Sequence, residues 1–391
     1  MIRVYLRVLF VAAGLAAQTA APSPVHLLPG TPIYLSCAAP ESIRRAAQDL
    51  KRDLHSVLRE DSPILSRLDP RHPAIVITGA ASEFTGPRDP AVSGREAHAA
   101  FVRGPYVVLQ GADMRGAIYA VYTFSEHYLG VPHLWYWSSW KPERKQGVDI
   151  PAAARLYFPP PYVRWRAWFT NDQDLLAPWK ARSQENYEAI FETMVRLKIN
   201  TLEGEMMDRD SFDHPYQAGR EFRLARNRGL AVTGHHMRIF GSNCEHWDVY
   251  WRKIRNQGPP PLTIADVQAL ENFWRYHIQT GMHEDLEMIW LIGFRGKNDN
   301  PFWQLFPDAP ATDAARAKVI QDMMTREVAL LKTTTGNPSP VMRITLYNKN
   351  SDFFAQGLLH PPSDPTLIWA FVAARRDHFP AADVRGFRND A

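Results

Sequence analysis

The sequence predicts a two-part α/β protein, in which a small N-terminal α/β domain is followed by an incomplete (β/α)8 TIM-type barrel. Apolar segments of strand length alternate with amphipathic helical patterns along most of the 391 residues. No Gly-rich dinucleotide loop accompanies this alternation in the second part, which favours a barrel over a doubly wound sheet. We therefore expect the first domain over 25–150, a proline-rich linker over 151–161 and the barrel over 162–391.

The composition is that of a folded protein with a near-neutral charge. Hydrophobic residues make up 45% of the chain and charged residues 22%, which excludes a disordered or fibrous protein. Lys and Arg number 45 against 41 Asp and Glu, and the sequence contains no basic run and no nucleic-acid motif. We therefore expect no nucleic-acid partner. Two cysteines are too few for a disulfide framework or a cysteine-based metal site.

The first 21 residues have the layout of a secretory signal peptide. Arg3 and Arg7 precede an apolar run from Val8 to Ala17, and small residues follow. The run is shorter than the about 20 residues of a membrane-spanning helix, although an uncleaved anchor is the alternative interpretation. We expect removal of residues 1–21, a secreted or periplasmic protein, and no stable membrane association afterwards.

The first domain mixes strands and helices. The sequence predicts strands at 33–37 and 74–80, the second of them continuously apolar as in a strand buried on both faces. Apolar residues at helical spacing predict a helix over 41–58. A hairpin is expected around Gly104, followed by a second helix over 114–129.

The second part repeats a strand-then-helix pattern. Six strands are predicted, at 165–172, 200–206, 230–237, 287–296, 341–348 and 366–374. Helical patterns lie between them, at 184–197, 219–228, 264–280, 312–331 and 351–358. A complete barrel has eight strands in about 250 residues. The sequence therefore predicts a truncated barrel with an open seam beside its first strand.

Polar residues follow the predicted strands, at the positions where barrel enzymes place their chemistry. They are Asn171, Asp172, Glu203, Glu205, His235, His236 and Arg295. Glu203 and Glu205 are two residues apart on one strand and so face the same side. Neighbouring buried carboxyl groups shift each other's pKa values apart, so that one can act as an acid and the other as a base. The alternative is that an arginine pairs with one of them and solvent surrounds the other.

The other strand-end residues fit substrate contacts better than a metal site. Asn171 and Asp172 can orient a sugar hydroxyl or cap a turn. His235 and His236 have no third ligand at zinc spacing, so we expect one of them to contact substrate, with a structural histidine as the alternative. Arg295 can hold a carboxylate with its planar fork or form a salt bridge to one of the two glutamates across the barrel. We expect no metal and no cofactor.

The chain resembles glycoside hydrolase family 115 in a series of motifs between about residues 112 and 369. The stretch GADMRGAIYAVYTFSEHYLG is similar to the family's Asp-x-Arg-Gly turn and helix, and VRWRAWFTND resembles its first barrel strand. NYEAIFETMVRLKINTL is similar to the following helix and second strand. TGHHM and IGFRGKND resemble two strand ends, SHHEPM and IGMRGDGD. The motifs occur in the family's order and at compatible spacing.

This resemblance implies a catalytic barrel that releases 4-O-methylglucuronic or glucuronic acid from xylan, with inversion and without a cofactor. Arg295 carries over as a residue suited to a uronate carboxylate. The two histidines, Asn171 and Asp172 carry over as positions that line the site.

The chain also departs from the family pattern at two places. Met237 and Arg238 stand where the family usually has Glu after His-His. The acidic pattern that follows the family's sixth strand is missing, and Asp377 is the carboxylate nearest to that place.

Three functions are consistent with these observations. The first is an exported glycoside hydrolase that uses an inverting two-carboxylate mechanism on uronate-decorated plant polysaccharide, with Glu205 or Glu203 paired with Asp377 or Asp172. The second is a catalytically inactive barrel that binds carbohydrate. The third is a hexosaminidase-like glycosidase. In each case the expected partner is a polysaccharide or oligosaccharide, and the sequence predicts no oligomeric state.

Overall fold

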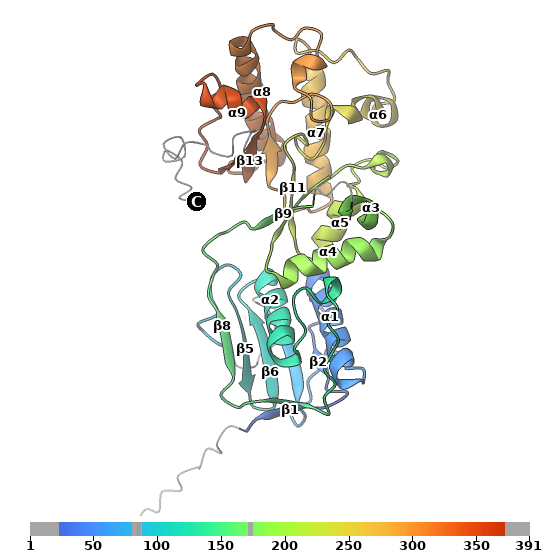
Figure 1. The fold of residues 1–391 in the computed structure, drawn as a ribbon, viewed down its shortest axis with the longest axis vertical. Coiled ribbons are helices and arrows are strands. Elements are labelled where there is room, and N and C mark those ends of the chain that lie inside the picture. Colours follow the sequence, from blue (N-terminus) through green and yellow to red (C-terminus); the bar gives the residue numbers. More distant parts are fainter. Residues whose placement is uncertain (1–22, 80–83, 85, 87, 171–174, 372–391) are drawn as a thin grey trace, which may run out of the picture.

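A computed structural model describes residues 23–371 of the chain, except 80–83, 85, 87 and 171–174. The molecule is elongated, with an N-terminal sheet and two helices at one end and a second set of strands and helices at the other (Figure 1). The signal-peptide prediction falls outside the described residues. None of the helices among the described residues is both long enough and apolar enough to cross a membrane.

A six-stranded mixed sheet forms the N-terminal part, in the order β3-β2-β4-β6-β5-β8. Its strands are β2 (Ile33–Tyr34), β3 (Ile64–Leu65), β4 (Ala74–Thr78), β5 (His98–Arg103), β6 (Tyr106–Gly111) and β8 (Arg155–Phe158). The first four in spatial order run parallel, whereas β5 is antiparallel to both of its neighbours. A separate antiparallel pair joins β1 (Val25–Leu27) to β7 (Val148–Ile150). The predicted hairpin around Gly104 is confirmed as the β5–β6 connection.

The linker prediction is wrong for residues 155–158, because these residues form β8 on the sheet. Arg155 helps to fix this strand, since its Nε lies 2.6 Å from Oδ2 of Asp89. Pro151 and the prolines at 159–161 flank the strand without interrupting it. Proline is tolerated next to a short edge strand. The proline-rich composition of this stretch is therefore compatible with the strand β8.

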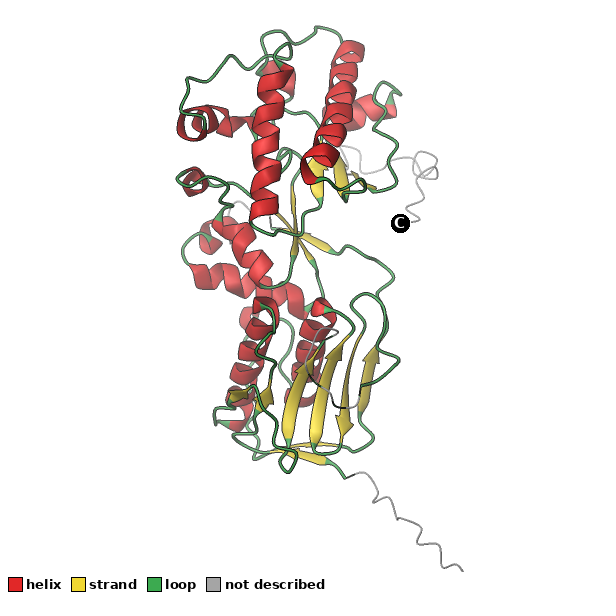
Figure 2. Ribbon diagram, turned by 180° about the vertical axis from the view of Figure 1, so that it is seen from behind, coloured by secondary structure: helices red, strands yellow, loops and turns green. Residues whose placement is uncertain are grey.

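Two helices cover one face of this sheet, α1 (Glu41–Leu58) and α2 (Met114–Phe124), as Figures 1 and 2 show from opposite sides. Asp113 caps α2 by accepting a hydrogen bond from the Gly116 N–H at 2.8 Å. Gly116 is needed where α2 meets the sheet, because a Cβ there would lie 2.5 Å from the Ala97 carbonyl. One π-helical turn, η1 (Ser125–Leu129), continues α2 and completes the predicted helix.

Six parallel strands make up the second part, and each lies within a predicted strand. They are β9 (Ala167–Phe169), β10 (Thr201–Gly204), β11 (Ala231–Gly234), β12 (Trp290–Ile292), β13 (Met342–Leu346) and β14 (Leu367–Phe371). They form two three-stranded sheets, joined between β11 and β12 by one parallel bridge from Val232 to Met288. Among the described residues no strand pairs with the outer edges of β9 and β14. The arrangement there is an open arc and not a closed barrel.

The five predicted helical patterns of this part are confirmed. The helices are α3 (Leu176–Lys180), α4 (Gln184–Arg196), α5 (Arg220–Asn227), α6 (Trp247–Val249), α7 (Val267–His283), α8 (Asp313–Thr335) and α9 (Lys349–Ala355). Short turns of other helix types in this part are η3 (Arg209–Phe212), η4 (Cys244–His246), η5 (Tyr250–Ile254) and η6 (Phe302–Gln304), and η2 (Trp135–Trp137) lies in the N-terminal part. The start of α7 lies three residues later than predicted because Asp266 caps it, accepting from Ala269 N–H at 3.0 Å.

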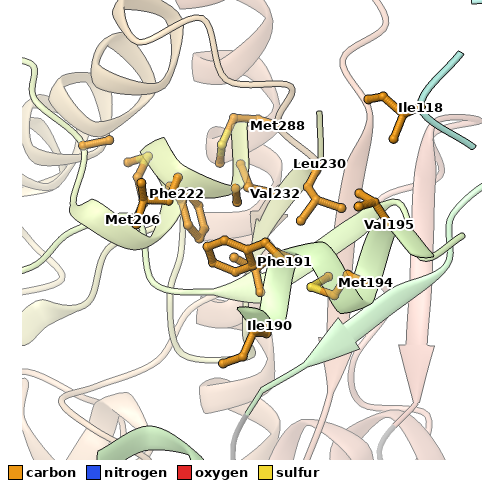
Figure 3. Packing of buried hydrophobic residues seen from close by; sticks show 14 of the residues in the cluster. Ile118, Ile190, Phe191, Met194, Val195, Met206, Phe222, Leu230, Val232 and Met288 are labelled. Atoms are coloured by element: carbon orange, nitrogen blue, oxygen red, sulfur yellow. The ribbon is translucent and has the colours of Figure 1, made fainter. Parts of the chain in front are cut away.

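Apolar side chains of α4 connect the strands to the rest of the core. Figure 3 shows Phe191 and Val195 of α4 beside Leu230 and Val232, which belong to the β11 segment. All four are nearly fully buried. This close packing fixes the β11 segment against α4.

A cluster of eight charged residues, here called the junction cluster, joins α1 to α4 and α5. It consists of Asp49, Asp53, Glu188, Glu192, Arg45, Arg52, Arg196 and Arg228. Arg196, which is fully buried, bonds Asp53 and Glu192, both at 2.7 Å. Arg228 bonds Asp49 across the same contact. Four cations therefore face four carboxylates, which balances the buried charge.

Candidate active site

The carboxyl ends of the parallel strands bring together a group of polar residues, here called the strand-end cluster. It consists of Glu205, His235, His236, Arg238, Arg295, Asp299 and Tyr347. These residues follow β10, β11, β12 and β13 in the chain. Parallel strands end at one edge of their sheet, so side chains far apart in sequence meet there.

The two glutamates predicted as a pair lie in different surroundings. Glu203 is within β10 and only 7% exposed, and its Oε2 lies 2.6 Å from Nη1 of Arg343 on β13. Glu205 lies beyond the strand with a half-exposed side chain, forms an ion pair with Arg238 and comes within 4.0 Å of His235 Nε2. The structure therefore separates a buried ion pair inside the arc from an accessible carboxyl group at its rim.

Burial raises the pKa of Glu205 above its usual value, and nearby acidic groups affect it too. The Arg238 guanidinium opposes this rise, whereas the carboxylates of Glu221 and Glu245 add to it. Oε2 of Glu221 also accepts a hydrogen bond from the Glu205 backbone N–H at 3.0 Å, which fixes the chain where β10 ends. A carboxyl group with a raised pKa in an accessible position can serve as a proton donor.

Both histidines reach the cluster, because β11 ends at Gly234 and the strict strand alternation ends with it. His235 stacks on Phe169, with ring centroids 5.2 Å apart. Burial, with His236 and Arg238 nearby, lowers the pKa of His235 to about 3. His236 bonds Asp299 through Nε2, and its ring centroid lies 4.3 Å from that of Tyr347. Burial lowers the pKa of His236 as well, so both rings are uncharged near neutral pH.

Arg295 is 5% exposed and lies against residues of its own loop. Its Nη2 donates to the Asp299 carbonyl oxygen and lies 3.7 Å from Asp299 Oδ1, while its guanidinium carbon is 5.7 Å from the Tyr347 ring centroid. Burial lowers the pKa of this guanidinium. The alternative of a salt bridge from Arg295 to Glu203 or Glu205 is wrong, since Arg343 and Arg238 occupy those carboxylates.

Several buried nitrogen atoms of the cluster have no hydrogen-bond partner among the residues that the structure describes. They are Nε of Arg295, Nε of Arg238 and Nδ1 of His235. Buried polar atoms are normally satisfied, so unmatched ones at strand ends are expected where a ligand binds. The cluster is therefore suited to an acceptor-rich, anionic group.

The sequence prediction missed Asp299, Arg238, Arg343 and Tyr347 as members or neighbours of the cluster. Asp299 could have been found, because it follows Arg295 by four residues in the polar loop IGFRGKND. Arg343 lies inside an apolar strand, where only the packed structure shows its partner Glu203. The predicted residues Asn171, Asp172 and Asp377 lie outside the described residues.

Within the described part of the chain, no group of three or more His, Cys, Asp or Glu side chains could hold a metal ion. A cavity of about 750 Å³ lies beside β9, among Trp137, Trp168, Trp179 and other apolar side chains. Of the strand-end region it includes Phe169, which stacks on His235, but none of the predicted site residues that the structure describes. The charged cluster and this apolar cavity are thus neighbouring but distinct features.

The sequence of residues 159–388 matches the model of glycosyl hydrolase family 115. The chain belongs to this family. The resemblance found in the motifs is thereby confirmed, and the match begins directly after β8. A comparison with curated proteins gave no match.

Solved structures share the fold of this family 115 chain. A family GH115 4-O-methyl-α-glucuronidase, BtGH115A, with specificity for decorated arabinogalactans, has a TM-score of 0.70 at 21% identity, over 88% of this chain and 45% of that one. A GH20 β-N-acetylhexosaminidase from Streptomyces coelicolor A3(2) and a β-N-acetylhexosaminidase from Bacteroides fragilis NCTC 9343 have TM-scores of 0.51 and 0.52 at 12% identity. They cover 93% and 90% of this chain, and 69% and 68% of theirs. The chain therefore spans less than half the length of the family 115 structure.

Proposed function

We propose that the chain is an exported glycoside hydrolase that releases glucuronic acid or 4-O-methylglucuronic acid from a plant polysaccharide such as glucuronoxylan. Family membership supports the class of reaction. The observation that carries the proposal is Arg295, a buried cation at a strand end with Nε unmatched among the described residues. A planar guanidinium recognises a carboxylate bidentately, which distinguishes a uronic acid from a neutral sugar.

The strand-end cluster offers two carboxyl groups for an inverting mechanism. Glu205, whose pKa is raised by burial, is proposed to protonate the leaving oxygen. Asp299, with a side chain 61% exposed and bonded to the neutral His236, is proposed to activate water. Glu203 is less suited to either role because Arg343 engages it inside the arc. Asp172 and Asp377 stay sequence-based candidates for the second carboxylate.

The neutral histidines are proposed to position groups without adding charge. His236 holds Asp299, and the stacked ring of His235 lies close to Glu205. No step requires a cofactor. Export is proposed from the layout of residues 1–21 alone.

Release of uronic acid from polysaccharide tests this function. Purified chain is incubated with 4-O-methylglucuronoxylan, with an arabinogalactan carrying the same uronic acid, and with aryl N-acetylhexosaminides. We expect uronic acid from at least one of the two polysaccharides and no N-acetylhexosamine. Release of N-acetylhexosamine alone would establish the hexosaminidase-like alternative.

The second candidate function is a carbohydrate-binding barrel without hydrolysis. It is favoured by one specific observation, the ion pair between Glu205 and Arg238, because a guanidinium neighbour favours the ionised carboxylate over the acid. Binding of glucuronoxylan without release of uronic acid, unchanged in Glu205→Gln, would select this function.

A further inference from the structure

The loop that carries Arg295 leaves the parallel sheet earlier than its neighbour does. The strand β12 pairs with β13 only over Trp290–Ile292, whereas β13 continues to Leu346 alongside β14. The departure occurs at Gly293, whose φ of +144° is rarely adopted by residues with a side chain. Arg295 therefore lies in the irregular segment 293–296 after β12, here called the Gly293 turn, where the strand ladder no longer fixes its backbone.

The N–H of Gly293 is satisfied from a helix outside the sheet. It donates to Oε2 of Glu327, in the middle of α8, at 2.7 Å. Glu327 is 0% exposed, and its Oε1 has no hydrogen-bond partner among the described residues. Burial raises the pKa of this carboxyl group well above its usual range. Burying a carboxyl group with so few hydrogen-bond partners is energetically unfavourable. The hydrogen bond that Glu327 does make is to the turn that carries Arg295.

Two further contacts hold the same turn. The Cys244 thiol donates to the Arg295 carbonyl oxygen, with an S···O distance of 3.6 Å. The Phe294 ring is buried between the rings of Phe302 and Phe306, whose centroids lie 5.0 and 5.1 Å away. The backbone is thus held at three consecutive residues, by groups from α8, η4 and the η6 segment.

We propose that Glu327 is a positioning residue, which fixes the Gly293 turn through its hydrogen bond and so orients the Arg295 side chain in the strand-end cluster. Its effect on uronide binding rests on the proposed function, whereas its effect on the loop does not. Among the described residues, the Glu327 side chain accepts its hydrogen bond from the Gly293 N–H and not from a residue of the strand-end cluster, so it acts through the backbone of residues 293–295.

Hydrogen exchange followed by mass spectrometry tests the effect on the loop without any activity assay. Glu327→Leu removes the acceptor, so peptides covering 290–300 are expected to exchange about tenfold faster. Glu327→Gln keeps an acceptor oxygen and is expected to stay within about twofold of wild type. Leu331→Ala, a buried position one turn further along α8, is the matched control and should leave this loop unchanged. Equal exchange in Glu327→Leu and wild type would overturn the proposal, as would equal acceleration in Leu331→Ala.

Steady-state kinetics with a uronide substrate tests the consequence at Arg295. Glu327→Leu is expected to raise KM about tenfold with kcat changed less than about threefold, because a misplaced cation weakens ground-state and transition-state binding alike. Glu327→Gln should restore the wild-type KM. A loss confined to kcat, or a Gln variant as impaired as Leu, would contradict the positioning role. Absence of hydrolysis by wild type with the expected exchange pattern would instead count against the proposed function.

The pH dependence of stability provides a test with a variant that retains the side-chain shape. The folded pKa of Glu327 is raised, so its stabilising contribution is complete below the unfolded pKa, near 4.5, and declines as pH rises toward the folded value. The Cys244 thiol, the titratable group that faces it, has a pKa raised to about 12 and stays protonated. The Tm of Glu327→Gln relative to wild type should therefore increase from pH 5 to pH 9. A constant difference would contradict a buried, protonated Glu327.

Discussion

The junction cluster and the strand-end cluster contain similar residue types but differ in how far their carboxylates are exposed. In the junction cluster, four arginines face four carboxylates, whose side chains are between 3% and 14% exposed. In the strand-end cluster, Arg238 and Arg295 also lie beside carboxylates, but the side chains of Glu205 and Asp299 are 46% and 61% exposed. Removing one partner of a buried ion pair is strongly destabilising, so the junction cluster holds elements together. Buried arginines beside accessible carboxylates identify the place where a ligand can bind.

Catalysis is expected to change most, in Glu205→Gln. This change removes the proposed acid, so release of uronic acid from glucuronoxylan should fall by about 10²–10⁴-fold. An aryl glucuronide with a good leaving group needs less protonation and should lose less. In wild type, kcat/KM should decline as pH rises through the raised pKa of Glu205, and the variant should lack that limb.

Glu245→Gln is the matched control for this prediction. Glu245 is the other carboxylate bonded to Arg238, but it has no proposed part in proton transfer. We expect less than a tenfold loss of rate. If the two variants were equally impaired, Glu205 would act only through Arg238.

The next largest effect is expected on stability, from Arg228→Met in the junction cluster. Arg228 is 7% exposed, and its removal leaves Asp49 buried without its main cation. Breaking a buried pair in this way costs about 3–5 kcal/mol of unfolding free energy, measurable by urea denaturation. Arg71→Met, which alters an exposed arginine, should leave the urea denaturation midpoint nearly unchanged. A rise in KM for the uronide substrate without a loss of unfolding free energy would instead show that the junction cluster belongs to the active site.

The smallest effect is expected at the edge of the same cluster, from Arg45→Gln. The Arg45 side chain is 25% exposed and pairs with Glu188 and Glu41. Partly exposed ion pairs contribute about 0–1 kcal/mol, so urea denaturation should show a change in that range. A loss of unfolding free energy as large as that of Arg228→Met would contradict the view that the contribution of each ion pair depends on its burial.

Periodicity along the chain predicted most of the second part of the fold. Every predicted strand there contains an observed strand and every predicted helix overlaps an observed helix, because each buries one apolar stripe or run that the local sequence shows. The linker was misassigned at 155–158, where the pairing partner that makes β8 a strand lies over fifty residues earlier. Local sequence does not reveal such partners.

The position of the candidate site was predictable from the sequence, but the ion pairs between its residues were not. Strand ends identified Glu205, His236 and Arg295 because parallel strands share one edge. That Glu203 bonds Arg343 and that Arg238 bonds Glu205 depends on which strands lie opposite one another. Glu327 gave no signal at all, since a glutamate in a helix is ordinarily on the exposed face.

Arg295 is proposed to make the strand-end cluster a site for a sugar carboxylate. The decisive experiment is calorimetric titration of wild type and Arg295→Gln with glucuronic acid, and with glucose as the neutral analogue. We expect glucuronic acid to bind wild type at least about tenfold more tightly than glucose, and Arg295→Gln to lose that difference, as a charge-assisted bidentate contact requires. Equal binding of both sugars to wild type, or an unchanged preference in Arg295→Gln, would contradict the claim.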